Sequence, residues 1–252
     1  MRTNDILVSA FPKSGITFFG FLLVAARLRH NGMALRPTLY NIDFLLIDVH
    51  KMQGHQPASI WHDGIGDLYK THDRFAKVPN VIYVLRDPVD TMRSYFHFRR
   101  RLGTNESVAA FLAGPHGIDG WIAHVRSWLV DNRAAEQSVF VTLYEYLVAQ
   151  PRDELRAVGE QLGLEFSDET LDYAVEAASL QSMRASEAGF VARNPVNAQF
   201  ALEFVRPTEH RAVEGFTPDL VESIRTRAQP IYEQIKSRLG PAPAATTPVS
   251  AR

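Results

Sequence analysis

A lysine lies in a short polar interruption between two apolar runs near the start of the chain. Residues 6–23 read ILVSAFPKSGITFFGFLL, and the polar insert is PKSG. A strand that is followed by such an insert and then by a helix forms an anion cradle, because the N–H groups and the dipole of the helix N-terminus favour negative charge. Gly15 lets a ligand approach the backbone. Ser14 and Thr17 supply hydroxyls, and Lys13 supplies a mobile cation. On its own, the pattern also fits an ordinary strand-to-helix turn.

The order of residues in this insert separates it from the phosphate-binding loop of ATPases and kinases. That loop follows the pattern GxxxxGK[ST], whereas here the lysine precedes the glycine and no glycine lies upstream. The sequence also has no carboxylate cluster with the spacing of a magnesium site. The pattern therefore favours an anion-binding loop of another kind, with a nucleotide-dependent kinase as an alternative.

Apolar runs along the chain predict the elements that must position this loop. The predicted strands are 5–11, 67–72, 80–87 and 138–147, and the predicted helices are 17–30, 88–102, 117–133, 151–164 and 168–178. Alternation of strand and helix implies an α/β fold with a central parallel sheet flanked by helices on both faces. Residues 31–66 and 186–215 lack clear periodicity, which is typical of the walls or lid of a pocket.

Length and composition bound the class of protein. With 252 residues, of which 46% are hydrophobic and 22% charged, the chain fits one globular domain, expected over 1–240. The Pro/Ala/Thr-rich residues 241–252 predict a disordered tail. A net charge of −1 gives no footprint for nucleic acid or an anionic membrane. The absence of cysteine excludes disulfides, thiolate metal sites and cysteine nucleophiles.

Targeting and membrane signals are not evident in the sequence. The first eight residues read into a strand and show no pattern of a cleaved leader. The longest apolar run, 18–26, is far shorter than the ~20 residues of a membrane helix. We therefore expect a cytoplasmic protein with no membrane partner. The sequence supports no particular oligomeric state.

At the loop, the chain resembles the sulfotransferases that use 3′-phosphoadenosine 5′-phosphosulfate (PAPS) as the sulfuryl donor. The 5′-phosphosulfate loop of that family reads PKSGTTW, and residues 12–18 here read PKSGITF. Ile16 replaces a threonine and so removes one phosphate-binding hydroxyl. Phe18 replaces the tryptophan that packs near adenine. The resemblance spans 6–219 and implies that Lys13, Ser14, Gly15, Ile16, Thr17 and Phe18 bind PAPS, and that adenosine 3′,5′-bisphosphate (PAP) is the product.

Two further motifs carry the resemblance most specifically. The family binds the 3′-phosphate with an arginine and, eight residues on, a serine, and Arg86 and Ser94 have that spacing in LRDPVDTMRSYFHF. Taken alone, these two residues read as an ion-pair partner and a solvated helix residue. Between the two phosphate motifs, YKTHDRF resembles the Lys-Thr-His segment in which the histidine is the catalytic base. The resemblance therefore assigns that role to His72, one of nine histidines.

Three later segments resemble the family less specifically. Tyr144 matches a tyrosine beside adenine, and Leu180 and Met183 match residues that line the adenine site, although each also fits an ordinary core position. The family's late Arg-Lys-Gly segment, which grips the 3′-phosphate, is retained only as Arg206 followed by Pro-Thr. Arg211 is an alternative for that role.

The resemblance implies in-line sulfuryl transfer, in which positioning and charge stabilisation dominate. Lys13 would neutralise the leaving PAP, and His72 would accept the proton of the acceptor hydroxyl. Lys70, two residues earlier on the same strand, shares that side and can stabilise the sulfuryl oxygens. A sulfuryl group carries less charge than a phosphoryl group, so we expect no metal.

The acceptor is expected to be a small molecule. Phe98 matches a family position that gates the acceptor site, and Phe11, Phe18 and Trp61 are expected to form aromatic walls. An apolar pocket with a histidine base favours a small aromatic or apolar hydroxyl compound over a long sugar chain. A non-catalytic PAPS- or PAP-binding module is the second alternative, since Ile16 and the Arg206 segment depart from the family.

Overall fold

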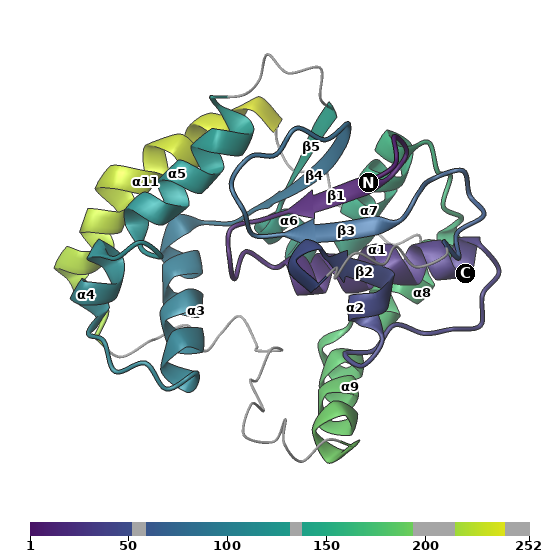
Figure 1. Cartoon of the computed structure of the whole chain (residues 1–252), viewed down its shortest axis with the longest axis horizontal. Helices are drawn as coiled ribbons and strands as arrows, with labels where there is room; N and C mark the ends of the chain where they lie inside the picture. Colours follow the sequence, from purple (N-terminus) through teal and green to yellow (C-terminus); the bar gives the residue numbers. More distant parts are fainter. Residues whose placement is uncertain (52–58, 132–137, 194–214, 240–252) are drawn as a thin grey trace, which may run out of the picture.

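The centre of the molecule is a parallel sheet of five strands (Figure 1). The computed structural model describes residues 1–51, 59–131, 138–193 and 215–239, with the side chains of 190–193 excepted. The strands are β1 (Ile6–Ser9), β2 (Leu46–Asp48), β3 (Leu68–Thr71), β4 (Asn80–Leu85) and β5 (Ser138–Leu143). Their spatial order is β2-β3-β1-β4-β5, and every neighbouring pair is parallel. The predicted α/β class is thus confirmed.

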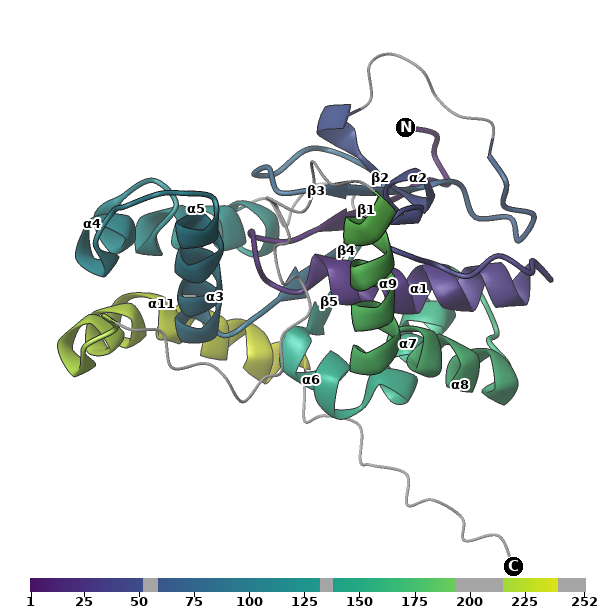
Figure 2. The ribbon, with the colours of Figure 1, turned by 90° about the horizontal axis from the view of Figure 1, so that it is seen from below.

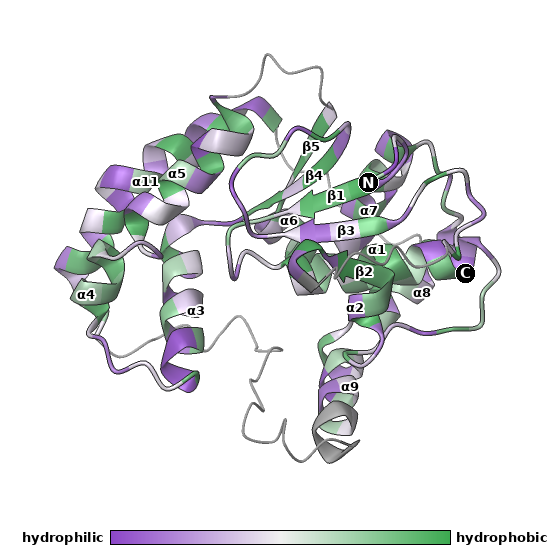
Figure 3. Ribbon diagram, viewed as in Figure 1, coloured by the Kyte–Doolittle hydropathy of each residue, from purple (hydrophilic) through white to green (hydrophobic). Residues whose placement is uncertain are grey.

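Strands β1 and β4 are buried on both faces, as their apolar sequences indicate (Figure 3). Successive side chains of a strand point to opposite faces, and two separate core clusters follow this alternation. Along β1, Ile6 and Val8 belong to one cluster and Leu7 to the other. Along β4, Ile82 belongs to the first cluster and Tyr83 to the second. Each face of the sheet therefore needs its own cover of helices.

Two groups of helices provide these covers. One face carries α1 (Ile16–His30), α7 (Pro151–Leu162) and α8 (Asp168–Ala177). The other carries α3 (Pro88–Arg101), α4 (Val108–Ala113), α5 (Ile118–Leu129) and α11 (Pro218–Leu239). The second group lies on the left of Figure 1 and the first on the right, and Figure 2 shows the sheet between them from below. The remaining elements are α2 (Ile42–Leu45), a 3₁₀ turn η1 (Val49–Lys51), α6 (Tyr144–Ala149) and α9 (Leu180–Arg193).

Local sequence fixes the entry of α3, the helix after β4. The Asp87 side chain accepts hydrogen bonds from the backbone N–H groups of Val89 and Asp90, and Pro88 occupies the first helical position. Such an N-cap contributes about 1 kcal/mol, and proline has the right φ there. The helix ends in Arg99, Arg100 and Arg101, whose charges suit the negative end of the helix dipole.

The position of β1 determines where a ligand can bind. β1 lies between β3 and β4, so the connections that follow β1 and its neighbours run to opposite sides of the sheet. In open α/β sheets, such a switch in direction creates a crevice at the carboxyl ends of the strands. The loop after β1, the end of β3 and the end of β4 all meet at this edge.

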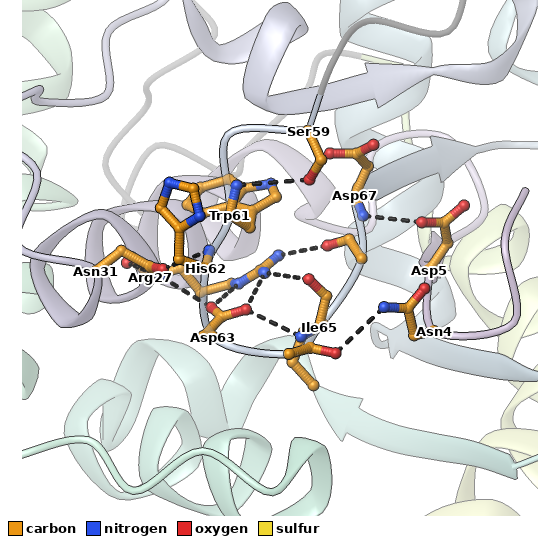
Figure 4. Close-up of polar contacts among 12 residues, drawn as sticks. Asn4, Asp5, Arg27, Asn31, Ser59, Trp61, His62, Asp63, Ile65 and Asp67 are labelled. Carbon is orange, nitrogen blue, oxygen red and sulfur yellow. Dashed lines mark hydrogen bonds and ion pairs between the residues drawn. The ribbon is translucent and has the colours of Figure 1, made fainter.

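The opposite edge of the sheet, at the amino ends of the strands, is closed by a buried ion pair (Figure 4). Arg27, near the end of α1, donates from Nε and Nη2 to the Asp63 carboxylate at 2.9 and 2.7 Å. It also donates to the carbonyls of Gly66 and Ile65, and its guanidinium lies 4.1 Å from the ring centre of Trp61. The side chains of Arg27 and Asp63 are 0% and 1% exposed, so this network ties α1 to the segment that enters β3.

The structure corrects several of the predicted elements. β2 lies inside 31–66, where its three residues are too short to produce a periodic signal. The predicted strand 138–147 is wrong beyond Leu143, where α6 begins, because its partner β4 ends at Leu85 and offers no further hydrogen bonds. The helix α9 includes 186–193, which the sequence left without periodicity. The predicted tail 241–252 lies outside the described residues.

Candidate active site

The loop between β1 and α1 has the geometry of an anion cradle. Ser14 is buried, and its N–H donates to the carbonyl of Phe11 at 3.1 Å. Lys13 and Gly15 have φ values of 70° and 100°. Lys13 is the one non-glycine residue with positive φ in the described part of the chain, a conformation that costs free energy and clusters at functional sites. No described side chain caps the N-terminus of α1, and its first turn holds no acidic residue. The dipole there is available to an anion.

Tyr144 lies directly over the glycine of this loop. A Cβ atom added at Gly15 would lie 2.2 Å from Cδ2 of Tyr144, so only glycine fits beneath the ring. The Phe18 ring meets the Tyr144 ring edge-on, with 6.4 Å between centroids. Two aromatic residues predicted to lie near adenine are therefore in contact with each other at the loop.

Arg86 links the loop to Tyr144 from the end of β4. Its Nη1 donates to the carbonyl of Lys13 at 3.0 Å, and its guanidinium lies 4.2 Å from the Tyr144 ring centre. Arg86 is 8% exposed, and its Nε has no hydrogen-bond partner among the described residues. Burial lowers the pKa of the guanidinium, against the opposing effect of Tyr144 and nearby carboxylates. A buried cation short of acceptors is a good fit for a phosphate. Ser94 lies half-buried on α3.

His72 follows the end of β3, and its ring is oriented by the backbone. Its Nδ1 lies 2.7 Å from the carbonyl oxygen of Ala10. Because a carbonyl only accepts, Nδ1 must carry the hydrogen, which leaves Nε2 of the neutral ring with a free lone pair. Crowding of protein atoms around the ring lowers the pKa of His72, the Ala10 carbonyl opposes this, and the charge of Lys70 adds to the lowering. The ring is therefore neutral at pH 7 and can accept a proton.

Both predicted catalytic lysines have a described contact. The Nζ of Lys13 lies 4.5 Å from the ring centre of Phe98 on α3, within the range of a cation–π interaction. The Nζ of Lys70 forms a 2.6 Å ion pair with Oδ1 of Asp43 on α2. Asp43 was not singled out in the sequence, because one aspartate in a stretch without periodicity gives no signal.

A second histidine behind the site was also missed. His124 on α5 is 3% exposed, and its Nδ1 lies 2.8 Å from the Tyr83 hydroxyl of β4. Burial and the nearby charge of His72 lower the pKa of His124 to about 4, so its ring is neutral. The ring of Phe11 packs edge-on against His124. The polar residue in the apolar helix pattern WIAHVRSW was the available signal.

The structure moves one predicted residue away from this site. Trp61 packs on Arg27 at the amino edge of the sheet, opposite the loop, so its prediction as an acceptor wall is wrong (Figure 4). The prediction failed because Trp61 lies in a stretch without assigned elements. The sequence there does not show which edge of the sheet an aromatic residue reaches. Phe11 is buried against Tyr95 and Phe98 packs on the same core cluster, so both lie beside the loop.

The adenine-site predictions are placed only in part. Met183 on α9 is 4% exposed and belongs to the core cluster that contains Ile16, while Leu180 is 40% exposed. Arg206 and Arg211 lie outside the described residues.

In the described ranges, no group of three metal-ligating side chains could hold an ion. Nor is any helix of those ranges both long and apolar enough to cross a membrane, and the cellular location stays a prediction.

Comparison with known proteins identifies the family. The family described as "Sulfotransferase domain" matches residues 3–237. Sulfotransferase 1A1 of Bos taurus is 26% identical over an alignment of 204 residues, and the match covers 72% of this chain and 66% of that protein. Sulfotransferase 1B1 of Canis lupus familiaris is 24% identical over an alignment of 206 residues, and the match covers 73% of this chain and 67% of that protein. The matches span about two thirds of these relatives. The chain belongs to the sulfotransferase family, which confirms the predicted resemblance.

Solved structures of other proteins have a similar fold. Mouse sulfotransferase SULT7A1 complexed with PAP has a TM-score of 0.60 at 18% identity and covers 94% of this chain and 90% of its own. Retinol dehydratase in complex with androsterone and the inactive cofactor PAP has a TM-score of 0.57 at 15% identity, covering 98% and 84%. At this identity the likeness shows the fold, and both proteins bind PAP on it.

Proposed function

We propose that this protein transfers the sulfuryl group of PAPS to the hydroxyl of a small acceptor. The observation that carries the proposal is the meeting of two devices at one edge of the sheet. One is the uncapped N-terminus of α1 with Lys13 and Arg86. The other is His72, whose ring is neutral and oriented with Nε2 as an acceptor. Binding an anion requires only the first device, whereas transfer to a hydroxyl also requires the second.

The donor would lie across the loop with its 5′-phosphosulfate on the backbone N–H groups of residues 14–17. Ser14 and Thr17 would add hydroxyl donors, and the 3′-phosphate would satisfy Arg86 and Ser94. The buried, unpartnered Nε of Arg86 supports this assignment, since it needs an acceptor that the described protein does not supply. PAP bound to two proteins of the same fold also supports it.

The adenine would lie against the aromatic contact of Phe18 and Tyr144, with Leu180 and Met183 beyond it. Arg206 or Arg211 would close the 3′-phosphate site from a segment that the structure does not describe. Ile16 contributes a buried apolar side chain in place of a hydroxyl.

The transfer step uses three side chains in different roles. The acceptor oxygen attacks sulfur as its proton moves to Nε2 of His72. The bond between sulfur and the 5′-phosphate oxygen breaks, and its electron pair stays on that oxygen. Lys13 neutralises the charge that develops there, and Lys70 stabilises the sulfuryl oxygens. The products are the sulfate ester, PAP and a proton that His72 releases to water.

The acceptor side is lined by Phe11 and Phe98, next to Lys13. These rings favour a small apolar or aromatic alcohol or phenol, because they offer contact area and few polar groups. Androsterone, bound by a protein of the same fold, is a compound of this kind.

Calorimetry and a transfer assay test the proposal together. PAP should bind far more tightly than adenosine 5′-phosphate, because Arg86 and Ser94 recognise the 3′-phosphate through charge-assisted bonds. PAPS with a panel of phenols and alcohols should give sulfate esters. Tight PAP binding without turnover on any acceptor would indicate the non-catalytic module. Equal affinity for the two nucleotides, with phosphoryl transfer from ATP and magnesium, would indicate the kinase.

A further inference from the structure

Asp43 lies on α2, and its carboxylate bonds to Lys70, one of the proposed catalytic residues. α2 has four residues, and its Ile42 and Leu45 side chains bury it against the core at 5% and 6% exposure. The Asp43 side chain is 39% exposed, and its Oδ1 lies 2.6 Å from the Lys70 ammonium. This ion pair adds to the apolar contacts that Ile42 and Leu45 make with the core.

The strand register brings this ion pair next to the proposed base. β2 follows α2 directly, and its Asp48 pairs with Lys70 of β3. His72 is two residues beyond Lys70, just after the end of β3, and the charge of Lys70 acts on its ring. The Lys70 side chain is 18% exposed, and the ion pair with Asp43 restricts the positions that its ammonium can take. Fixing a long lysine side chain in advance avoids part of its entropy loss during reaction.

Other charged and titratable groups also face His72. Asp48 of β2 raises the pKa of its ring, whereas Lys13 of the loop and Lys70 lower it. His50 of η1 pairs with Asp73, the residue after His72, at 2.9 Å, and His124 of α5 lies close enough to feel the charge of His72. Nearby charges of both signs therefore act on the ring. Removing one carboxylate should lower the pKa of His72.

We propose that Asp43 is a positioning residue, which holds Lys70 beside His72 and offsets the positive charge of Lys70 at the ring. The expected effect of Asp43 on turnover rests on the proposed function. The expected effect of Asp43 on the pKa of His72 does not, because it depends only on charges in the folded protein. Asp43 touches neither donor nor acceptor in this account, and it acts through Lys70.

The first measurement follows the His72 ring directly by NMR titration, with His72→Asn used to assign its signal. In Asp43→Asn, a negative charge is lost, the imidazolium is disfavoured, and the His72 pKa should fall by on the order of half a unit. Asp43→Glu should restore it. Asp172→Asn, which removes the exposed partner of Arg152 on α8, is the matched control and should leave it unchanged. An unchanged pKa in Asp43→Asn overturns the electrostatic part.

The second measurement is a double-mutant cycle on turnover. Asp43→Asn should lower kcat by roughly 10-fold, leave PAP affinity within about twofold, and move the acid limb of the pH–rate profile to lower pH. In a Lys70→Met background the same substitution should lower kcat no further. An equal loss in both backgrounds would show that Asp43 does not act through Lys70. Absence of transfer by the wild type would remove the proposed function, while the titration would still decide the charge effect of Asp43.

Discussion

The two edges of the central sheet each hold a buried arginine, but in opposite states. At the amino edge, Arg27 donates to both oxygens of Asp63 and to two carbonyls, and Trp61 covers its face. At the carboxyl edge, Arg86 makes a hydrogen bond to the Lys13 carbonyl, and its Nε lacks a partner among the described residues. A cation with all its acceptors supports the fold. A cation short of acceptors is prepared for an anionic ligand.

The largest difference between the two edges should be in how a histidine substitution at each edge changes transfer activity. His72→Ala at the carboxyl edge should lower transfer by about 10²–10⁴-fold, because the acceptor loses its base, while PAP affinity and melting temperature stay near wild type. His62→Ala at the amino edge, where His62 is exposed, is the matched control and should transfer normally. His72→Asn should be as inactive as the alanine variant, since an amide cannot take the proton.

The pH dependence sharpens the same test. Because the folded environment lowers the His72 pKa, the transfer rate should rise with pH through a value below about 6.5, and this limb should be missing in the residual rate of His72→Ala. Full activity in either His72 variant would return the residue to a structural role.

The second-largest effect should be on stability, at the amino edge. Asp63→Ala leaves the Arg27 charge buried and unpaired, so the free energy of unfolding should fall by about 3–5 kcal/mol in urea titrations. The exposed pair of Arg152 and Asp172 provides the control, and Asp172→Ala should cost at most about 1 kcal/mol. Similar losses in both variants would contradict the role assigned to Arg27.

Lys13→Ala should show the reverse behaviour, with little change in stability. Its kcat should fall by about 10²-fold or more, because Lys13 acts on charge that exists only in the transition state, while KM for PAPS changes little. Lys77→Ala removes an exposed lysine after β3 and should have no effect. A rise in KM alone would make Lys13 a donor-binding residue instead.

A smaller effect is expected from the ring that supports Lys13. Phe98→Leu keeps an apolar side chain but removes the cation–π contact, so kcat should fall about 2–5-fold. Phe98→Tyr keeps the ring face and should retain the wild-type rate. Equal losses in the two variants would mean that packing against the acceptor, and not the contact with Lys13, explains the effect.

The smallest effect is expected from the C-terminus. Deleting the residues after Gly240 should leave both the melting temperature and turnover almost unchanged, because this segment has no apolar periodicity with which to pack. A clear loss of either quantity would show that the segment docks on the domain.

Sequence reasoning predicted the parts of the site that depend on order along one chain segment. The loop at Lys13 and the end of β4 at Arg86 each follow a strong apolar run, and His72 follows the shorter strand candidate 67–72, so parallel strands bring all three to one edge. The role of Trp61 was misjudged and Asp43 was missed. Both residues lie in 31–66, a stretch with one three-residue strand. Which edge of the sheet such residues reach is decided by packing against α1 and β3, and no local pattern encodes it.

The pairing of β1 also orders the assembly of this protein. β1 is the first of the described strands along the chain, yet Ile6 pairs with Leu68 and Leu7 pairs with Val81, so both of its sheet partners are distant in sequence. Such non-local pairing makes folding slow compared with a helical bundle. The positive φ of Lys13 is supported by the hydrogen bond that Arg86 donates to its carbonyl. A nascent chain that ends before Arg86 therefore carries the loop between β1 and α1 without this hydrogen bond.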